Sequence, residues 1–270
     1  MTLRRVTVGG VELAVATSGD GPSCLVLHGF TGSAAAMHPL TEGLDATVIA
    51  LDIVGHGASE APDDVESYRM DAIVAQIDGV LDALGVEAVV IVGYSFGARV
   101  ALSYTVAHPG RVRHLVTIGG TAGLDDAAEA AARRTADDAL AADIEAHGIE
   151  AFVDTWEQAS IFATQRDLPD PVRATIRSGR LANRPVGLAN SLRGAGTGAM
   201  PSLWDALTEL TVPCTIVVGA LDTKFSEIGE RMAALLPNAV VERIPGAGHA
   251  AHLEAPAPCR GIVQRVLGAS

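Results

Sequence analysis

The chain has 270 residues, of which 49% are hydrophobic, and its 32 acidic and 19 basic residues give a formal net charge of −13. This length suits one large domain, or one domain that carries an insertion, with a sizeable buried core. The negative net charge argues against nucleic acid as a partner, because phosphate backbones bind basic surfaces. No apolar run approaches the roughly 18 residues that a membrane-spanning helix needs, so we expect no membrane span.

The start of the chain and its cysteines indicate the compartment. The first residues lack the apolar middle and the small-residue cleavage site of a signal peptide. Cys24, Cys214 and Cys259 are widely spaced and odd in number, so they match neither a zinc motif nor a disulfide framework. We expect small buried side chains at these positions, no metal or cofactor, and a cytoplasmic protein.

Strand-like and helix-like segments alternate over most of the chain. Two alternating runs, residues 3–8 and 11–17, meet at Gly9-Gly10 and predict a hairpin. Near-continuous apolar runs follow, which suit strands buried on both faces of a parallel sheet. These runs cover residues 23–28, 47–52, 88–93, 112–119, 213–219 and 239–244, and helical patterns cover 69–84, 96–107 and 227–236. The order predicts an α/β fold with a mostly parallel central sheet and helices on both faces.

The alternation stops between about Leu124 and Pro201. This stretch is rich in alanine and helical in pattern, with no clear strand. A helical excursion that returns to the sheet predicts a lid over the carboxyl ends of the strands, where open α/β sheets bind ligands. We therefore expect a core of residues 1–123 and 202–270 and an inserted helical lid of residues 124–201.

The segment Gly93-Tyr94-Ser95-Phe96-Gly97 contains a Gly-x-Ser-x-Gly pattern. The pattern alone is weak, but here a predicted strand precedes it and a predicted helix follows it, as a nucleophile elbow requires. The elbow favours an α/β-hydrolase fold with Ser95 as its catalytic serine.

A serine hydroxyl needs a neighbouring base, which in turn needs an orienting acid. His249 follows the last predicted strand and Asp222 follows the strand before it, so the chain order is Ser, Asp, His, as this fold expects. His28, His56 and His252 are rival bases. Asp52 is a rival acid, but it precedes a Gly-His-Gly loop, where turn capping is the plainer explanation.

Two backbone amides are candidates for an oxyanion hole. The N–H of Phe96 directly follows Ser95, and the N–H of Phe30 lies in the segment His28-Gly29-Phe30-Thr31-Gly32 after the third strand. We expect His28 to be a structural hydrogen-bonding residue. Two amides aimed at one oxygen suit any reaction that builds negative charge on a carbonyl or enolate oxygen.

Basic residues gather near the predicted site of this acidic chain. Arg99 lies four residues after Ser95 and so shares its helix face, and Lys224 follows Asp222 by two. Arginine holds carboxylates with two parallel hydrogen bonds. The hypothesis is a positive pocket for a substrate with more than one carboxylate, although a surface role is equally common for any single arginine. The arginines of the insertion are Arg133, Arg134, Arg180, Arg184 and Arg193.

With these features together, the chain resembles the 2-succinyl-6-hydroxy-2,4-cyclohexadiene-1-carboxylate synthases of menaquinone biosynthesis. The resemblance covers nearly the whole chain. Its more specific motifs are residues 93–99, 152–156, 162–165, 191–198 and 222–225, several of which lie in the lid.

The resemblance implies a lyase that removes a ring proton and expels pyruvate from 2-succinyl-5-enolpyruvyl-6-hydroxy-3-cyclohexene-1-carboxylate. It places the triad on Ser95, Asp222 and His249, with the serine as the base. It implies a small-molecule polycarboxylate as partner, and recognition of its carboxylate and carbonyl groups by Tyr94, Arg99, Arg133, Trp156, Arg180 and Lys224.

Two other functions share these motifs. A hydrolase that acts on an ester or a carbon–carbon bond would use the same elbow and triad through an acyl-serine; the arginine set favours the lyase. A non-catalytic receptor or interaction protein of this fold has less need of an intact Ser, Asp and His set.

Overall fold

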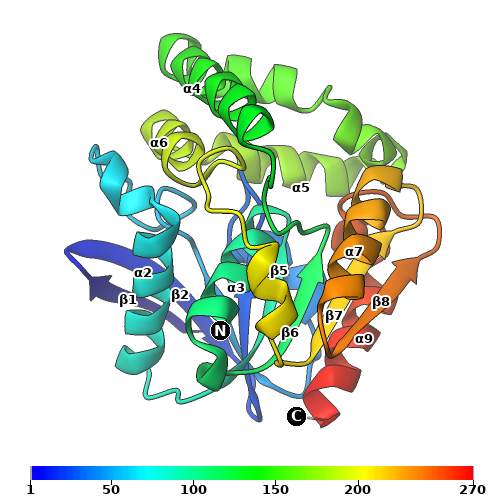
Figure 1. Ribbon diagram of the computed structural model, residues 1–270. Helices are drawn as coiled ribbons and strands as arrows, with labels where there is room; N and C mark the ends of the chain where they lie inside the picture. Colours follow the sequence, from blue (N-terminus) through cyan, green and yellow to red (C-terminus); the bar gives the residue numbers. More distant parts are fainter. Residues whose placement is uncertain (1, 270) are drawn as a thin grey trace.

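The computed structural model describes residues 2–269, which fold around one eight-stranded sheet (Figure 1). The spatial order is β1-β2-β4-β3-β5-β6-β7-β8; the β1–β2 and β2–β4 pairs are antiparallel and the others are parallel. Every predicted strand is present with its ends within one residue of the expected position. The strands are β1 (Thr2–Val8), β2 (Val11–Ser18), β3 (Ser23–Leu27), β4 (Thr47–Leu51), β5 (Val89–Tyr94), β6 (Val112–Ile118), β7 (Cys214–Gly219) and β8 (Ala239–Ile244).

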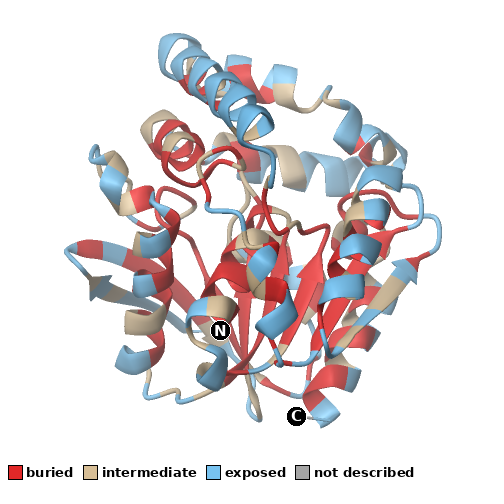
Figure 2. Cartoon of the chain, viewed as in Figure 1, coloured by how far each residue is buried: buried red, intermediate tan, exposed pale blue. Residues whose placement is uncertain are grey.

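Helices cover both faces of the sheet, as predicted. Leu25 and Leu27 of β3 pack toward α2, α3 and α7, whereas Cys24 and Val26 pack toward α1, α8 and α9. Successive side chains of a strand point to opposite faces, so one strand supplies both halves of the core. The helices of the core are α1 (His38–Thr41), α2 (Met70–Ala83), α3 (Phe96–Ala107), α7 (Thr223–Leu235), α8 (Ala251–Glu254) and α9 (Pro256–Ala269). Figure 2 shows the buried strands between these two helical layers.

Helix α7 starts four residues before the predicted beginning at residue 227. The carboxylate of Asp222 accepts a hydrogen bond from the Phe225 N–H at 3.2 Å, which caps the helix. Short 3₁₀ turns complete the connections: η1 (Ala34–Met37), η2 (Val65–Tyr68), η3 (Pro109–Arg111), η4 (Ser160–Asp167) and η5 (Asp205–Glu209).

A helical segment lies between β6 and β7 and covers the carboxyl ends of the strands (Figure 1). It comprises α4 (Ala127–Trp156), η4, α5 (Asp170–Leu181) and α6 (Pro185–Ala195). Helix α4 is kinked at Gly148, whose φ of 81° and ψ of 179° are not helical. Buried Ile144, Phe152 and Leu188 join α4 and α6 in a small core of their own. We propose residues 124–201 as the bounds of this lid.

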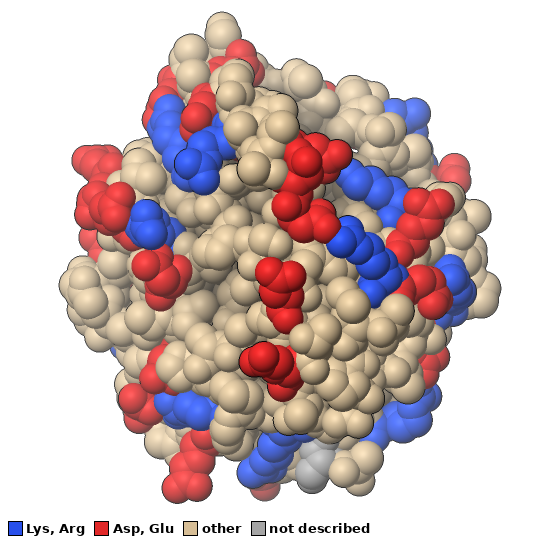
Figure 3. All heavy atoms as spheres, in the orientation of Figure 1, with Lys and Arg blue, Asp and Glu red and all other residues tan. Residues whose placement is uncertain are grey.

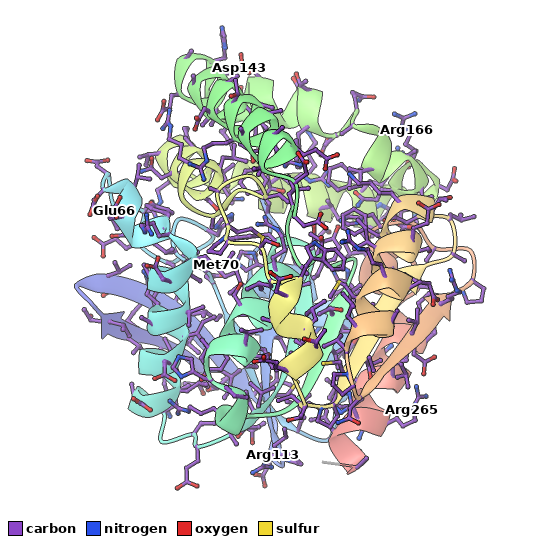
Figure 4. All side chains as sticks on the ribbon, viewed as in Figure 1. Glu66, Met70, Arg113, Asp143, Arg166 and Arg265 are labelled. Carbon is purple, nitrogen blue, oxygen red and sulfur yellow. The ribbon has the colours of Figure 1, made fainter. Side chains whose placement is uncertain are left out.

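Two helices of the lid differ in burial. Helix α6 packs against α4 and against η2 of the core, whereas α5 exposes most of its residues. Figure 2 shows this contrast, and in Figure 4 the labelled Asp143 and Arg166 project outward from the lid. Within residues 2–269, no helix combines the length and apolar character needed to cross a membrane.

Candidate active site

Ser95 occupies a strained turn between β5 and α3. Its φ of 50° and ψ of −106° lie outside the regions that non-glycine residues favour. The Ser95 N–H donates to the Ile118 carbonyl at 2.8 Å. A Cβ on Gly93 would collide with the Gly97 carbonyl, and a Cβ on Gly97 would lie 2.5 Å from the His28 carbonyl oxygen. The turn therefore requires both glycines of the elbow.

The structure brings Ser95, His249 and Asp222 together. The Oγ of Ser95 lies 3.0 Å from Nε2 of His249, and Nδ1 of His249 lies 2.8 Å from Oδ2 of Asp222. An ionised carboxylate can only accept, so the Nδ1 hydrogen belongs to the bond with Asp222. Nε2 is then free to accept the hydroxyl hydrogen of Ser95.

Neighbouring bonds hold the loops that carry this triad. Asp222 caps α7 with one carboxylate oxygen and contacts His249 with the other. Glu254 accepts hydrogen bonds from the N–H groups of Gly248 at 2.5 Å and Ala250 at 3.3 Å. His249 itself is buried, so the imidazole has little freedom to turn away from Ser95.

The rival acid Asp52 and the rival base His28 have structural partners. Asp52 accepts from the amides of Ala34 at 2.6 Å and Ala58 at 2.8 Å, which explains it as a loop-capping residue. His28 donates from Nδ1 to the Gly29 carbonyl at 2.8 Å and accepts from the Ile53 N–H at 3.1 Å. None of these residues replaces Asp222 or His249 beside Ser95.

Burial keeps three histidines near the site neutral. It lowers the pKa of His28 to about 4 and the pKa of His56 and of His252 to about 3. The ring of His252 packs on Tyr94 with 4.2 Å between ring centroids. His252 therefore lies in the wall of the site, under Tyr94 and not in contact with the Ser95 hydroxyl.

The two predicted oxyanion donors lie at the same cavity as Ser95. Phe30, Phe96 and Ser95 all line it. Neither the Phe30 nor the Phe96 N–H donates to another residue in the described part of the chain. Unpaired amides at a cavity wall are available to a ligand oxygen.

The cavity beneath the lid has a volume of about 840 Å³. Its lining includes the side chains of Arg99, Arg133, Arg180 and Lys224, and no aspartate or glutamate among the described residues. On the surface shown in Figure 3, in contrast, acidic and basic side chains are interspersed. The protein thus concentrates positive charge in one enclosed place although its net charge is −13.

Arg99 is the basic residue nearest the elbow in sequence. It donates to the Ala195 carbonyl at 2.6 Å, and its guanidinium lies 5.0 Å from the ring centre of Phe96. Burial, and to a lesser extent the positive charge of Arg133, lowers the pKa of Arg99 to about 10. Two cations of the cavity lining therefore lie close enough to repel each other.

The remaining cations reach the cavity from the lid and from α7. Arg180 donates to the side chains of Gln165 at 3.0 Å and Glu157 at 3.2 Å, and its guanidinium lies 4.8 Å from the Phe162 ring centre. Lys224 is exposed at the rim, 5.9 Å from the ring centre of Phe225. Arg180 is thus fixed by side chains, whereas the Lys224 side chain forms no hydrogen bond or ion pair within residues 2–269.

Three lid arginines of the predicted positive pocket lie elsewhere, so that part of the hypothesis is wrong. Arg193 forms a two-pronged ion pair with Glu145, at 2.6 and 2.7 Å. Arg134 donates to the Gly198 carbonyl at 3.2 Å, and Arg184 donates to the Ser59 carbonyl. None of the three lines the cavity, and each is bonded to a group outside the cavity lining.

Two aromatic residues complete the predicted set. Tyr94 lines the cavity, and burial raises the pKa of its hydroxyl. Trp156 also lines the cavity and stacks on Phe152 with 5.5 Å between centroids. The Nε1 of Trp156 is buried and has no hydrogen-bond partner within residues 2–269. Both predicted aromatic residues thus lie in the wall of the cavity.

Sequence reasoning missed the residues that hold the cations. Asp137 accepts from the Nε of Arg133 at 2.8 Å, and Gln165 and Glu157 accept from Arg180. The signal for Asp137 was present, because residues four apart share a helix face. Glu157 and Gln165 reach Arg180 across separate elements, which no spacing rule reveals.

Comparison with known proteins supports the same family. The family model described as "alpha/beta hydrolase fold" matches residues 22–256. A protein of Bacillus subtilis (strain 168) is 40% identical to this chain over 261 residues. Its name, 2-succinyl-6-hydroxy-2,4-cyclohexadiene-1-carboxylate synthase, is provisional. The match covers 96% of this chain and 95% of that protein.

Two solved structures extend the comparison. The structure of MenH from S. aureus superposes with a TM-score of 0.90 and 32% identity, covering 94% of this chain and 98% of the other. A thermophilic esterase from Thermogutta terrifontis with bound malate superposes with a TM-score of 0.87 and 25% identity, covering 100% and 99%. On the full-length match and the shared fold, the chain belongs to the 2-succinyl-6-hydroxy-2,4-cyclohexadiene-1-carboxylate synthase family of α/β-hydrolase-fold enzymes.

Proposed function

We propose that the chain eliminates pyruvate from 2-succinyl-5-enolpyruvyl-6-hydroxy-3-cyclohexene-1-carboxylate, with the site residues described above. The observation that carries the proposal is the cavity over Ser95. It holds four cationic side chains, and no acidic side chain of the described residues lines it. A substrate with three carboxylates needs such an environment, because unpaired anions are costly to remove from water.

The change between substrate and product identifies the proton that leaves. The ring double bond at position 3 becomes two double bonds at positions 2 and 4, and the enolpyruvyl group departs from position 5. The proton at position 2 is therefore lost, and this carbon carries the succinyl carbonyl. Its removal develops negative charge on that carbonyl oxygen, which is the charge that an oxyanion hole stabilises.

In the proposed mechanism, Ser95 acts as the base. His249 accepts the hydroxyl proton at Nε2 while Asp222 holds its Nδ1–H, and the Ser95 oxygen takes the ring proton. The electrons of the C–H bond form the new double bond, and the existing double bond shifts. The carbon–oxygen bond to pyruvate then breaks. The departing enolate takes up one proton, so the reaction is proton-neutral.

The remaining groups bind and orient. We assign the amides of Phe30 and Phe96 as the donors to the succinyl carbonyl oxygen, because both line the cavity and are unpaired within the described chain. Arg99, Arg133, Arg180 and Lys224 bind carboxylates, while Tyr94 and Trp156 each offer a hydrogen bond. The partner is thus a small polycarboxylate, and the three free buried cysteines suit a reducing cytoplasm.

Release of pyruvate from the enolpyruvyl precursor tests the proposal. The purified wild-type chain should release pyruvate and form the conjugated diene at equal rates, as followed by a coupled dehydrogenase and by absorbance. Simple aryl esters serve as the comparison substrate. Fast ester hydrolysis without release of pyruvate would refute the lyase function.

A second candidate function is hydrolysis of an ester or a carbon–carbon bond through an acyl-serine. It is favoured by the superposition on the esterase with bound malate, a dicarboxylate. The same Ser95, His249 and Asp222 would serve it. Mass spectrometry of the protein during turnover separates the two reactions, because an acyl adduct on Ser95 forms only in the hydrolase.

A further inference from the structure

Asp137 is a buried carboxylate beside a cavity whose described lining contains no acid. It lies on α4, one helical turn after Arg133, and is only 3% exposed. Its Oδ1 accepts a hydrogen bond from Nε of Arg133 at 2.8 Å. Arg133 itself is half exposed and lines the cavity. The acid therefore contacts the inner side of an arginine whose outer end faces the ligand space.

The second carboxylate oxygen of Asp137 has no partner. Oδ2 is fully buried and forms no hydrogen bond within residues 2–269. A Cβ added to Gly196 would lie 2.5 Å from it. Gly196 directly follows Ala195, whose carbonyl accepts from Arg99. Asp137 thus lies between Arg133, on its own helix, and the end of α6 that holds Arg99.

Close packing maintains this burial. A Cβ on Gly198 would lie 2.6 Å from the Ala130 carbonyl oxygen, so the loop after α6 runs directly along the first half of α4. An unpaired buried carboxylate oxygen destabilises a fold, so its presence calls for an explanation. The structure therefore retains a costly acid at the place where two arginines converge.

The charges explain what the acid does there. The positive charge of Arg133 lowers the pKa of Arg99, and the negative charge of Asp137 raises it. Two guanidinium groups that share one anion repel each other while the cavity is empty. A carboxylate behind them reduces the repulsion without occupying the ligand space.

We propose that Asp137 is a positioning residue of the substrate site. It holds Arg133 by Nε, so that the two terminal nitrogens of the guanidinium face the cavity and bind one substrate carboxylate in parallel. It also offsets the repulsion between Arg133 and Arg99. This role deepens the proposed function and rests on it, since Asp137 acts through Arg133 and does not touch the substrate.

Steady-state kinetics of pyruvate release test the role. Asp137→Ala should raise KM about tenfold while kcat stays within about threefold, because binding and not chemistry is lost. Asp137→Asn keeps an oxygen that accepts from Nε and should recover most of the lost KM. A KM for Asp137→Ala within twofold of the wild-type value would refute the proposal, because substrate binding would then be nearly unaffected.

A double-mutant cycle separates positioning from general damage. Arg133→Ala should itself raise KM, and adding Asp137→Ala to it should raise KM no further, because the group that Asp137 positions is gone. Additive effects would mean that Asp137 acts independently of Arg133 and would overturn the proposal.

Glu145→Ala provides the matched control. Glu145 lies on the same helix and forms an equally close ion pair, with Arg193, but neither residue lines the cavity. Its loss should leave KM unchanged. If Glu145→Ala raised KM as much as Asp137→Ala, any loss of a lid ion pair would explain the result, and the proposal would fail.

One further measurement does not depend on turnover. In nuclear magnetic resonance spectra of arginine side chains, the Arg133 Nε–H should exchange slowly with water in wild type and in Asp137→Asn, and rapidly in Asp137→Ala. Wild-type protein that shows this protection but releases no pyruvate would refute the proposed function alone. Normal pyruvate release with an unprotected Arg133 Nε–H would refute the role of Asp137 alone.

Discussion

The two walls of the cavity differ in what holds their functional groups. On the sheet wall, Ser95, Asp222 and His249 follow β5, β7 and β8 and are fixed by backbone turns and caps. On the lid wall, other side chains fix the two arginines. Asp137 accepts from Arg133, and Gln165 and Glu157 accept from Arg180. The sheet wall is therefore rigid by construction, and the lid wall depends on individual replaceable contacts.

The comparison predicts the largest effect on the sheet wall. Ser95→Ala should lower kcat for pyruvate release at least about 1,000-fold, because no other described group lies 3.0 Å from Nε2 of His249 to act as the base. The melting temperature should change by no more than a few degrees. A variant that keeps a tenth of wild-type activity would show that Ser95 is not the base.

Arg99 lies between the two walls and should give the next largest effect. Arg99→Met should raise KM about 100-fold, since a buried cation that faces a carboxylate contributes several times more than an exposed one. The control is Arg113→Met, an exposed arginine of β6 at the opposite end of the sheet (Figure 4), which should leave KM unchanged. Equal KM values for the two variants would remove Arg99 from the binding site.

Acid sensitivity should belong to the core beneath the cavity, where three histidines are buried. His28, His56 and His252 have pKa values of about 4, 3 and 3, below the usual 6.5. A lowered folded-state pKa means that the unfolded chain binds more protons, so stability is intact above pH 6.5 and falls as the pH drops toward 4. At pH 5, each of the three histidines should lower the free energy of unfolding by about 2 kcal/mol relative to pH 8.

Urea unfolding between pH 8 and pH 5 measures this loss. The glutamine of His252→Gln cannot titrate in this range. The variant should therefore lose less unfolding free energy between pH 8 and pH 5, by the amount that one histidine contributes. An unchanged slope would mean that His252 is not held neutral in the folded protein.

The smallest effect should come from one lid contact. Gln165→Ala removes one of the two side chains that fix Arg180 and should raise KM about fivefold, because Glu157 still holds the guanidinium. Gln165→Glu should raise KM further, since a second carboxylate would compete with the substrate for Arg180. A Gln165→Glu variant that binds more tightly than wild type would contradict this view of the lid wall.

Most of the fold and the members of the triad could be predicted from local patterns. The strands are apolar runs whose period and length are set by burial on both faces, so their ends were predicted to within one residue. Ser95 was recognisable because a strand and a helix flank it, and Asp222 and His249 because each follows a strand. These signals lie within a few residues along the chain.

The lid wall was harder because it depends on tertiary packing. Arg133 and Arg134 are neighbours, yet only Arg133 reaches the cavity, and no local pattern distinguishes the two faces of an alanine-rich helix. Arg193 was expected nearby but is paired with Glu145 across two helices. Asp137 was overlooked because an acid near an anion site is unexpected until its hydrogen bond to Arg133 is seen.

The position of the lid in the chain has an evolutionary consequence. The whole helical segment enters and leaves between β6 and β7, after Ser95 and before Asp222 and His249. One continuous stretch of gene thus encodes a large part of the cavity lining, including Arg133 and Arg180, and exchanging it leaves the reacting groups in place. Descendants of one scaffold can in this way acquire new substrates by replacing a single module while they inherit the same chemistry.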